Sequence, residues 1–376
     1  MPTVKGVRSD AIKYVERNLD LYLEEVVRLA ELPAPTFQEA RRADYVLRRF
    51  QELGLEASLD GIGNVVGGPA GGDRRPAVLV AAHLDTVFPL DTDCRVRRED
   101  GRLHGPGVGD NASNLAGLLF LAQGLPAGDL QLERELLLAA TVGEEGLGDL
   151  RGVKQVLVDR QGEFDRAIIL DGSLGALVYQ GVGSRRLKVS CHAPGGHSWG
   201  LFGAPSAVHV LGRIISRISY LAVPQQPRTT YNVGTVRGGT SVNTIASEAE
   251  LLLDLRSVDR AELVKLEERV VALLKEAATE AGVEVRWECI GDRPTGSVPA
   301  DHPLVRAVRR VHRRLGIPTV EVPSSTDGNA LLSQGIPAVT IGLTTGGNGH
   351  RTDEYINIAP ASLGLQQLLW LLAELE

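Results

Sequence analysis

Three short, almost continuous apolar runs constrain the fold of this chain more than any other feature. They read AVLVAAHLD, ELLLAATV and RAIILDG, and a helix-like stretch, SNLAGLLFLAQGL, separates the first two. Strands that are apolar on both faces are typical of a sheet buried between two layers of helices. Because such strands alternate here with helices, the sequence predicts a mostly parallel sheet covered on both faces. The pattern resumes near the C-terminus, where AVTIGL follows the helical stretch HPLVRAVRRVHRRLG.

The middle of the chain follows a different order of elements. From about Gly183 we expect a strand (SRRLKVSCHA), a helix (PSAVHVLGRIISRISYL), two strands (TTYNVGTVRG and SEAELLLDLRS), a long helix and a last strand (VEVRWECI). This β-α-β-β-α-β order is that of the ferredoxin-like unit. With 376 residues, the chain is also too long for one ordinary core. We therefore predict an α/β domain, residues 1–182 and 292–376, interrupted by an inserted α+β domain at residues 183–291.

Local signals mark the ends of two predicted helices. Thr36 and Gly54 are expected to cap and to stop the helix in TFQEARRADYVLRRFQELG. Asp259 and Gly282 are expected to do the same for the long helix of the inserted domain. These four residues set the bounds that we expect for the two helices.

The overall composition argues against several classes of protein. Apolar residues make up 43% and charged residues 23% of the chain, as in soluble globular proteins. The net charge of −7 argues against a nucleic-acid-binding protein. We see no secretion signal at the N-terminus and no apolar run of membrane-spanning length. The three cysteines are typical of reduced thiols, so we expect a cytoplasmic protein without a membrane partner.

Imidazole and carboxylate side chains follow the predicted strands, at or just past the point where each one ends. In an open α/β sheet, ligands bind outside the carboxyl ends of the strands. The residues at these positions are His83, Asp85, Asp110, Glu144, Glu145, Asp171 and His350. We expect all of them to converge on one rim of the sheet.

Glu144 and Glu145 require a positive charge nearby, because adjacent carboxylates repel each other. Two imidazoles with several carboxylates form a nitrogen and oxygen ligand set, which suits zinc, manganese or cobalt better than a thiolate site would. So many carboxylates need more than one dication, and a pair of ions roughly 3.5–4 Å apart fits this number. We therefore predict two divalent metal ions, with zinc as the first choice and cobalt or manganese as alternatives.

The spacing of these residues suggests roles beside metal binding. His83 and Asp85 share one face of a strand, so Asp85 is expected to accept the proton of the ring nitrogen that does not bind metal. Of the two adjacent glutamates, one is expected to bind a metal ion and the other to accept a proton from water. Ordinary structural alternatives are a core histidine for His83, a helix N-cap for Asp110, a turn residue for Asp171 and a loop histidine for His350.

Five motifs in this order and spacing, HLDT, GVGD, GEEG, LDG and GHRTDEY, resemble those of the M20 metallopeptidase family. The resemblance covers nearly the whole chain and implies a zinc-peptidase-like catalytic domain interrupted by a ferredoxin-like lid domain. By position, it implies His83 and Asp171 as ligands of one metal ion, Glu145 and His350 as ligands of the other, and Asp110 as the bridge between them. It also implies that Glu144 is the general base and that Asp85 is an orienting acid.

The resemblance implies further functional residues in the lid domain. APGGHSWG resembles a lid motif in which His197 stabilises the oxyanion, in some members from the neighbouring subunit. Asn243, in GGTSVNTIA, and Arg256, in LDLRS, fill positions that bind substrate in the family. A guanidinium suits a substrate carboxylate because its fork matches two oxygens. From the residues alone, a structural role in a glycine turn also fits His197, and an ion pair with a neighbouring acid also fits Arg256.

Together these features predict a metal-dependent hydrolase that cleaves an amide bond in a small substrate. In the family, an aspartate at the position of Asp171 goes more often with aminopeptidases and dipeptidases, so we expect a di- or tripeptide as substrate. A deacylase of N-acyl amino acids uses the same chemistry and is the alternative. A non-catalytic binding protein on the same fold is disfavoured, because it has no need of Glu144. Some members dimerise through the lid domain, so we also expect a homodimer of this kind.

Overall fold

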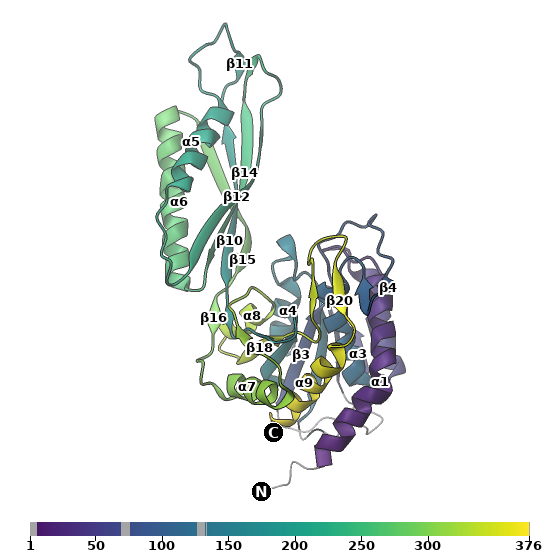
Figure 1. Ribbon diagram of the computed structural model, residues 1–376. Helices are drawn as coiled ribbons and strands as arrows, with labels where there is room; N and C mark the ends of the chain where they lie inside the picture. The colour runs from purple at the N-terminus through teal and green to yellow at the C-terminus, as the bar shows by residue number, and fades with distance from the viewer. Residues whose placement is uncertain (1–5, 69–75, 126–131, 133, 376) are drawn as a thin grey trace. The chain divides into compact units, whose positions relative to one another are not determined.

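The computed structural model describes residues 6–68, 76–125, 132 and 134–375. It divides into two compact units (Figure 1): unit 1 comprises Met1–Gly181 with Ser297–Glu376, and unit 2 comprises Val182–Gly296. Unit 2 is thus inserted into the sequence of unit 1. The boundary that we expected after residue 291 falls inside a strand, β15 (Glu284–Arg293), which continues unit 2.

A six-stranded sheet forms the centre of unit 1. Its strands are β1 (Glu56–Leu59), β2 (Val65–Gly68), β3 (Ala77–His83), β6 (Leu136–Thr141), β7 (Phe164–Leu170) and β18 (Ala338–Ile341), in the order β1-β2-β6-β3-β7-β18. The four strands β6, β3, β7 and β18 run parallel to one another. At the edge beside β6, β2 pairs antiparallel with β6 and β1 pairs antiparallel with β2. The prediction of a mostly parallel sheet is therefore confirmed.

Each parallel strand is buried because its two faces pack against different hydrophobic layers. Along β3, Val78 and Val80 belong to one core and Leu79 and Ala81 to the other. The first core includes helices α1 (Gly6–Ala30), α2 (Ala40–Glu52), α3 (Asn114–Gly124), α7 (Pro303–Leu315) and α9 (Ala361–Ala373). The second core includes helices α4 (Arg151–Asp159) and α8 (Gly328–Ser333). None of the helices in the part of the chain that the structure describes is long and apolar enough to cross a membrane.

A small second sheet in unit 1 brings distant loops together. Its strands are β4 (Arg97–Glu99), β5 (Arg102–His104), β19 (Gly346–Gly347) and β20 (Tyr355–Asn357), in the order β19-β20-β5-β4. The pairing of β5 with β20 places the chain after β5 beside the chain before β20. A kinked segment (Val108–Ser113), non-helical at Asp110 and Asn111, then leads into α3, and a 3-10 turn (Gly146–Gly148) follows β6. The remaining short strands are β8 (Ala176–Leu177), β9 (Gln180–Gly181), β16 (Gly296–Ser297) and β17 (Val320–Glu321).

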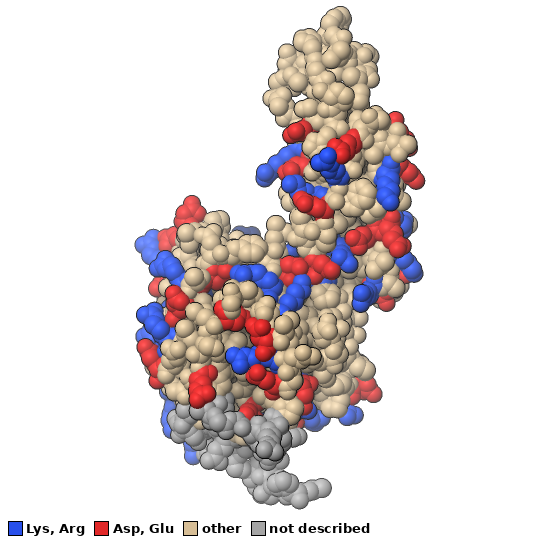
Figure 2. Space-filling model, turned by 180° about the vertical axis from the view of Figure 1, so that it is seen from behind, with Lys and Arg blue, Asp and Glu red and all other residues tan. Residues whose placement is uncertain are grey.

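Unit 2 has the predicted β-α-β-β-α-β order. Its elements are β10 (Gly183–His192), α5 (Ala207–Ser219), β12 (Thr229–Gly238), β14 (Glu248–Ser257), α6 (Arg260–Ala281) and β15. The strands form an antiparallel sheet in the order β12-β14-β10-β15, and α5 and α6 share a core with it. Two short strands, β11 (Gly196–His197) and β13 (Thr244–Ile245), pair at one end of the unit. The loops at that end, residues 193–206 and 238–247, contain no Lys, Arg, Asp or Glu, and Figure 2 shows this end without charged side chains.

One of the two expected helix starts is correct and the other is wrong. Asp259 caps α6, because its carboxylate accepts the backbone N–H of Glu262 at 3.0 Å. Thr36 does not cap α2, which begins at Ala40. The hydroxyl of Thr36 instead donates to the carboxylate of Asp85 at 2.8 Å. Thr36 is therefore bonded to a residue far away in the chain and not to the first turn of α2.

Candidate metal centre

The predicted ligands of unit 1 lie where its parallel strands end. His83 is the last residue of β3, and Asp171 follows β7 directly. Glu144 and Glu145 come three and four residues after the end of β6. Since β6, β3 and β7 are parallel neighbours, their carboxyl ends share one edge of the sheet. This edge is the rim on which we expected the side chains to converge.

The structure brings the five predicted ligands together in two overlapping groups. His83, Asp110 and Asp171 form one group, and Asp110, Glu145 and His350 form the other. Within each group the candidate ligand atoms all lie within 4.8 Å of one another. Asp110 belongs to both groups, which is the arrangement that a bridging carboxylate requires. His83, Glu144 and Glu145 form a third group of the same kind, so Glu144 stands beside the predicted ligands.

The two oxygens of Asp110 face different imidazoles. Its Oδ1 lies 3.1 Å from Nε2 of His83, and its Oδ2 lies 2.9 Å from Nε2 of His350. Nε2 of His350 is also 3.1 Å from Oε1 of Glu145. A carboxylate that presents one oxygen to each of two ligand groups can hold two cations side by side.

Burial and mutual contacts shift the pKa values of several groups in this centre. Burial and then the charge of Asp110 raise the pKa of Asp171 to about 7. Hydrogen bonds with Asp110 and Glu145 raise the pKa of His350 to about 10. Burial opposes a charge on His83, but its contacts with Asp110 and Asp85 still raise its pKa well above the ordinary value. Divalent cations would replace these protons, because metal ligands bind in their deprotonated forms.

A backbone contact sets the orientation of His83. Nδ1 of His83 lies 3.0 Å from the carbonyl oxygen of Asp85, and 3.5 Å from Oδ1 of the same residue. Because a carbonyl oxygen only accepts hydrogen bonds, Nδ1 stays protonated, so a metal ion would bind at Nε2 after that nitrogen has lost its proton. The shorter contact is therefore with the backbone of Asp85 and not, as we expected, with its carboxylate.

The carboxylate of Asp85 holds the turn that carries the two glutamates. Its Oδ1 accepts the backbone N–H of Glu144 and its Oδ2 accepts that of Glu145, both at 2.9 Å. Oδ2 also accepts the hydroxyl of Thr36, and Asp85 is fully buried. The buried Arg42 donates to the carbonyl oxygen of Leu84, the residue before Asp85, at 2.6 Å. Asp85 therefore positions Glu144 and Glu145 directly, through their main chain.

The loop that carries Asp110 is tied to neighbouring strand ends on both sides. The buried carboxylate of Glu354 accepts three backbone N–H groups of this loop, the last of which is that of Asp110. Asn111 follows a cis peptide bond and donates to the carbonyl oxygen of Leu170 at 3.0 Å. Asn114 accepts the backbone N–H of Leu343 at 2.9 Å. These contacts hold Asp110 near the ends of β7 and β18.

The residues of both groups fit divalent metal ions. Each group offers three nitrogen or oxygen atoms and no sulfur, a donor set that suits zinc and also cobalt or manganese. Three protein ligands leave room for a water molecule or substrate at a fourth position, as catalytic metal sites do. Bound cations would also offset the repulsion between the adjacent carboxylates of the site.

The three predicted lid residues lie in unit 2. Nδ1 of His197 accepts the backbone N–H groups of Trp199 at 3.2 Å and Gly200 at 3.3 Å. In the neutral ring the proton therefore sits on Nε2, which is then a donor. The backbone N–H of Ser198 donates to the carbonyl oxygen of Asn243 at 3.0 Å, so both predicted residues are held by paired loops.

Arg256 takes part in the ion pair that the residues alone allowed. Its Nε lies 2.6 Å from Oδ2 of Asp254 on the same strand, and its side chain is 39% exposed. A guanidinium has five N–H donors, so this contact leaves others for a second carboxylate.

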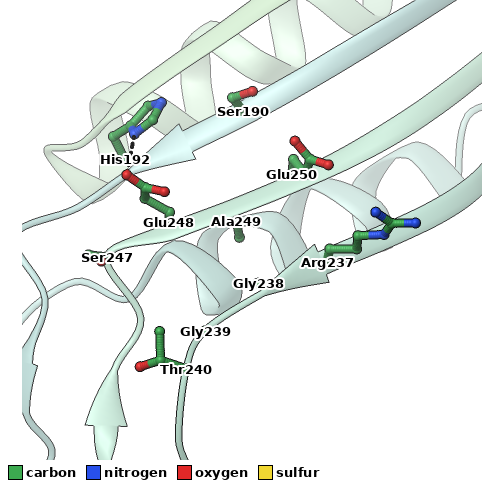
Figure 3. Close-up of a pocket in the computed structure, with 10 residues that line it drawn as sticks. All are labelled: Ser190, His192, Arg237, Gly238, Gly239, Thr240, Ser247, Glu248, Ala249 and Glu250. Carbon is green, nitrogen blue, oxygen red and sulfur yellow. Dashed lines mark ion pairs between the residues drawn. The ribbon is translucent and has the colours of Figure 1, made fainter.

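A separate pocket lies on the open face of the sheet in unit 2 (Figure 3). His192 and Glu248 lie side by side at one end of it, with 3.9 Å between Nδ1 and Oε1, and Ser190, Arg237 and Glu250 line it further along the strands. None of the predicted site residues lines this pocket. We therefore place the candidate site at the cluster of possible metal ligands in unit 1 and not at this pocket.

Sequence reasoning missed several residues that position the ligands. Thr36, Asn114 and Glu354 all hold the ligand-bearing segments by hydrogen bonds over long distances in the chain. Glu354 had a weak signal, because it stands within the motif GHRTDEY. Thr36 and Asn114 had none, since each pairs with a segment that only the folded chain brings near.

Comparisons with known proteins agree with the motifs. A family model described as peptidase family M20/M25/M40 matches residues 79–371. Among curated proteins, the acetylornithine deacetylase of Myxococcus xanthus is similar: it is 27% identical over 350 residues, which cover 84% of this chain and 87% of that protein. The match thus extends over most of both proteins.

Solved structures show the same fold. A tripeptidase from Staphylococcus aureus subsp. aureus Mu50 superposes with a TM-score of 0.80 at 23% identity, covering 95% of this chain and 98% of that one. The YXEP protein of Bacillus subtilis, described as a dinuclear metal binding peptidase from the M20 family, superposes with a TM-score of 0.69 at 17% identity, with coverage of 95% and 98%. From its motifs, its sheet and the match over residues 79–371, the chain belongs to peptidase family M20/M25/M40 and is a hydrolytic enzyme.

Proposed function

We propose that this hydrolase cleaves the amide bond of a di- or tripeptide at a centre of two divalent metal ions. The observation that carries the proposal is the position of Asp110, whose two oxygens face His83 on one side and His350 on the other. His83 and Asp171 would complete the set of ligands of one ion, and Glu145 and His350 that of the other. We propose zinc as the native metal, because imidazole with carboxylate is a common zinc ligand set.

The residues around the centre can do the proton chemistry of amide hydrolysis. When bound, the two cations would polarise the scissile carbonyl and acidify the attacking water. Glu144 is buried beside His83 and Glu145, and it would accept the proton of that water and pass it to the leaving amine. Its backbone N–H is held by Asp85, which fixes the main-chain position from which its carboxylate extends.

The lid residues supply binding groups of the right kind. His197 has its neutral-ring proton on Nε2, so it can donate a hydrogen bond to the oxyanion that forms at the scissile carbonyl. We propose Arg256 as the group that binds a substrate carboxylate, because its fork matches two oxygens. Asn243, on the loop beside His197, would donate to the backbone of the substrate.

A deacylase of N-acyl amino acids remains the alternative substrate class. The identity with the Myxococcus xanthus acetylornithine deacetylase favours it, whereas Asp171 in place of a glutamate favours the peptidase. The test is a parallel assay of dipeptides, tripeptides and N-acyl amino acids after reconstitution with zinc, cobalt or manganese, with a chelator as control. We expect chelator-sensitive release of free amino acids from peptides. Hydrolysis of acyl amino acids alone would refute the peptidase proposal, and activity that survives complete metal removal would refute the metal centre.

We also propose a homodimer that forms through unit 2. Trp199 and Phe202 are 88% and 93% exposed, and Val242, on the neighbouring loop, is fully exposed. Large exposed apolar side chains in a region without charge are typical of protein interfaces. Sedimentation of the natural chain and of a Trp199→Ser/Phe202→Ser variant would test this proposal, since the variant should shift from dimer to monomer. The three cysteines are free thiols, which agrees with the cytoplasm as the proposed location.

A further inference from the structure

We propose that Glu354 is a positioning residue of the metal centre. Its carboxylate holds the main chain that carries Asp110 and thereby keeps the shared ligand in place between the two ligand groups. The inference rests on the proposed function only in one respect, namely that the centre binds divalent cations.

The contacts of Glu354 are specific for a carboxylate. Its Oε2 accepts the backbone N–H of Gly107 at 2.8 Å. Its Oε1 accepts the backbone N–H groups of Gly109 at 3.1 Å and Asp110 at 2.8 Å. Glu354 is only 2% exposed. A buried carboxylate is costly unless hydrogen bonds satisfy it, and three donors from one turn meet that need.

The main chain of Glu354 is anchored independently of its side chain. Its carbonyl oxygen accepts the backbone N–H of Gly105 at 2.9 Å, at the point where β5 and β20 pair. The backbone of Glu354 is therefore tied to the end of β5, while its side chain reaches the turn that follows. The fixed backbone and the three contacts together define one position for the turn that ends in Asp110.

The sequence of this turn is adapted to the approach of the carboxylate. A Cβ atom at Gly109 would lie 2.7 Å from Oε1 of Glu354, which is closer than carbon and oxygen can pack. Gly107 has φ of +71°, and a Cβ atom there would lie 2.9 Å from Cγ2 of Thr86. Glycine at both positions lets the backbone N–H groups reach the carboxylate directly.

Glu354 also connects the two loops that carry ligands. It stands four residues after His350, so the same segment supplies a ligand of one group and the support of the shared ligand. Both oxygens of Asp110 lie within about 3 Å of the imidazoles that they face. A small movement of the Asp110 turn would therefore change both ligand groups at once.

The experiment measures metal affinity in two variants that break the contact from opposite sides. Glu354→Gln keeps the shape of the side chain but places an amide N–H₂ against a backbone N–H. Gly109→Ala keeps the carboxylate but pushes it away from the turn. Glu25→Gln is the matched control, because Glu25 is also a buried glutamate with several donors, Tyr45, Arg28 and Arg49. The dissociation constants for Zn²⁺ are obtained by competition with a chromophoric chelator, and circular dichroism checks that each variant is folded.

We expect Glu354→Gln and Gly109→Ala to bind Zn²⁺ about 10- to 100-fold more weakly than the natural chain, as loss of a contact that orients a ligand usually does. Glu25→Gln should bind Zn²⁺ with unchanged affinity. Hydrolysis by the first two variants should recover when Zn²⁺ is raised, because the defect lies in metal retention. A general loss of folding would not be reversed in this way.

The outcomes separate this inference from the proposed function. Folded Glu354→Gln and Gly109→Ala variants that bind Zn²⁺ as tightly as the natural chain would overturn the role of Glu354. If Glu354→Gln does not fold, the Zn²⁺ affinity of Gly109→Ala, which retains the carboxylate, is the test. Unchanged affinity in this variant would again overturn the role of Glu354. A natural chain that binds no metal would instead refute the proposed metal centre.

Discussion

Replacement of Asp85 by asparagine gives a sharp test of how the two glutamates are held. Asp85 is fully buried, and its carboxylate accepts three hydrogen bonds. Oδ1 accepts the N–H of Glu144, and Oδ2 accepts the N–H of Glu145 and the hydroxyl of Thr36. Asp85→Asn keeps the size of the side chain and removes one acceptor oxygen, so any effect comes from hydrogen bonding and charge.

The magnitude follows from the number of donors that lose their acceptor. The best placement of the asparagine puts its oxygen where Oδ2 now lies, which satisfies Glu145 and Thr36. Its amide group then faces the N–H of Glu144, donor against donor. A buried donor without an acceptor costs about 1–3 kcal/mol. The turn should therefore open roughly 5- to 140-fold more often, since each 1.4 kcal/mol is a factor of about ten.

Hydrogen exchange followed by mass spectrometry measures this opening directly. The peptide that covers residues 141–149 should exchange faster in Asp85→Asn by the factor given above, with a chelator present so that bound cations add no protection. Asp259→Asn is the control, because Asp259 also accepts a backbone N–H but does so at the start of α6. Unchanged exchange at Glu144 and Glu145 in Asp85→Asn would refute the reasoning.

Three further predictions concern catalysis and pH. Glu144→Gln should lower kcat by roughly 10²- to 10⁴-fold, the usual contribution of a general base, while the metal content measured by atomic absorption stays the same; a variant with full activity would remove Glu144 from the mechanism. His197→Ala should lower kcat by about 10²- to 10³-fold with unchanged zinc affinity, as loss of an oxyanion donor does, and a kcat equal to that of the natural chain would contradict this role. The metal-free protein should lose stability as the pH rises from about 4 to about 10, first through Asp171 and then through His350. Asp171 (pKa raised to about 7) and His350 (raised to about 10) both bind protons more tightly in the folded state, so the stability that they add is present at low pH and is lost as the pH rises through these values. Zinc affinity should rise over the same range, because the ligands bind as deprotonated groups. Thermal denaturation with and without zinc measures both effects. A metal-free protein that gains stability toward pH 9 would contradict the prediction.

The central sheet could be predicted because its burial leaves a mark in the sequence. Along β3, neighbouring residues pack into different cores, so no polar residue interrupts the run before His83. The strands of the small sheet could not be predicted in this way. β4, for example, is three residues long and exposed, and the apolar pattern does not mark it; it pairs with β5 across the two-residue turn Asp100-Gly101, whose φ angles of +48° and +73° are typical of a tight hairpin.

The candidate site could be predicted in outline, because parallel strands end at one edge of a sheet. The five predicted ligands are near each other in the structure, and their binding of metal remains a prediction. The contacts around them could not be foreseen. Thr36 fits the pattern of a helix cap, but it donates to Asp85, and Phe37 after it has φ of +73°. The partners of Glu354 are backbone N–H groups, which every residue except proline carries, so the glycines of the turn are compatible with this contact but do not identify Glu354 as its acceptor.

Diffraction from crystals grown with zinc, measured at the zinc absorption edge, tests the central claim most directly. We predict two anomalous peaks, one on each side of the carboxylate of Asp110 and about 3.5–4 Å apart. One peak would be bounded by His83 and Asp171, and the other by Glu145 and His350. A single peak, or peaks away from Asp110, would contradict the shared role of its two oxygens and with it the proposed centre.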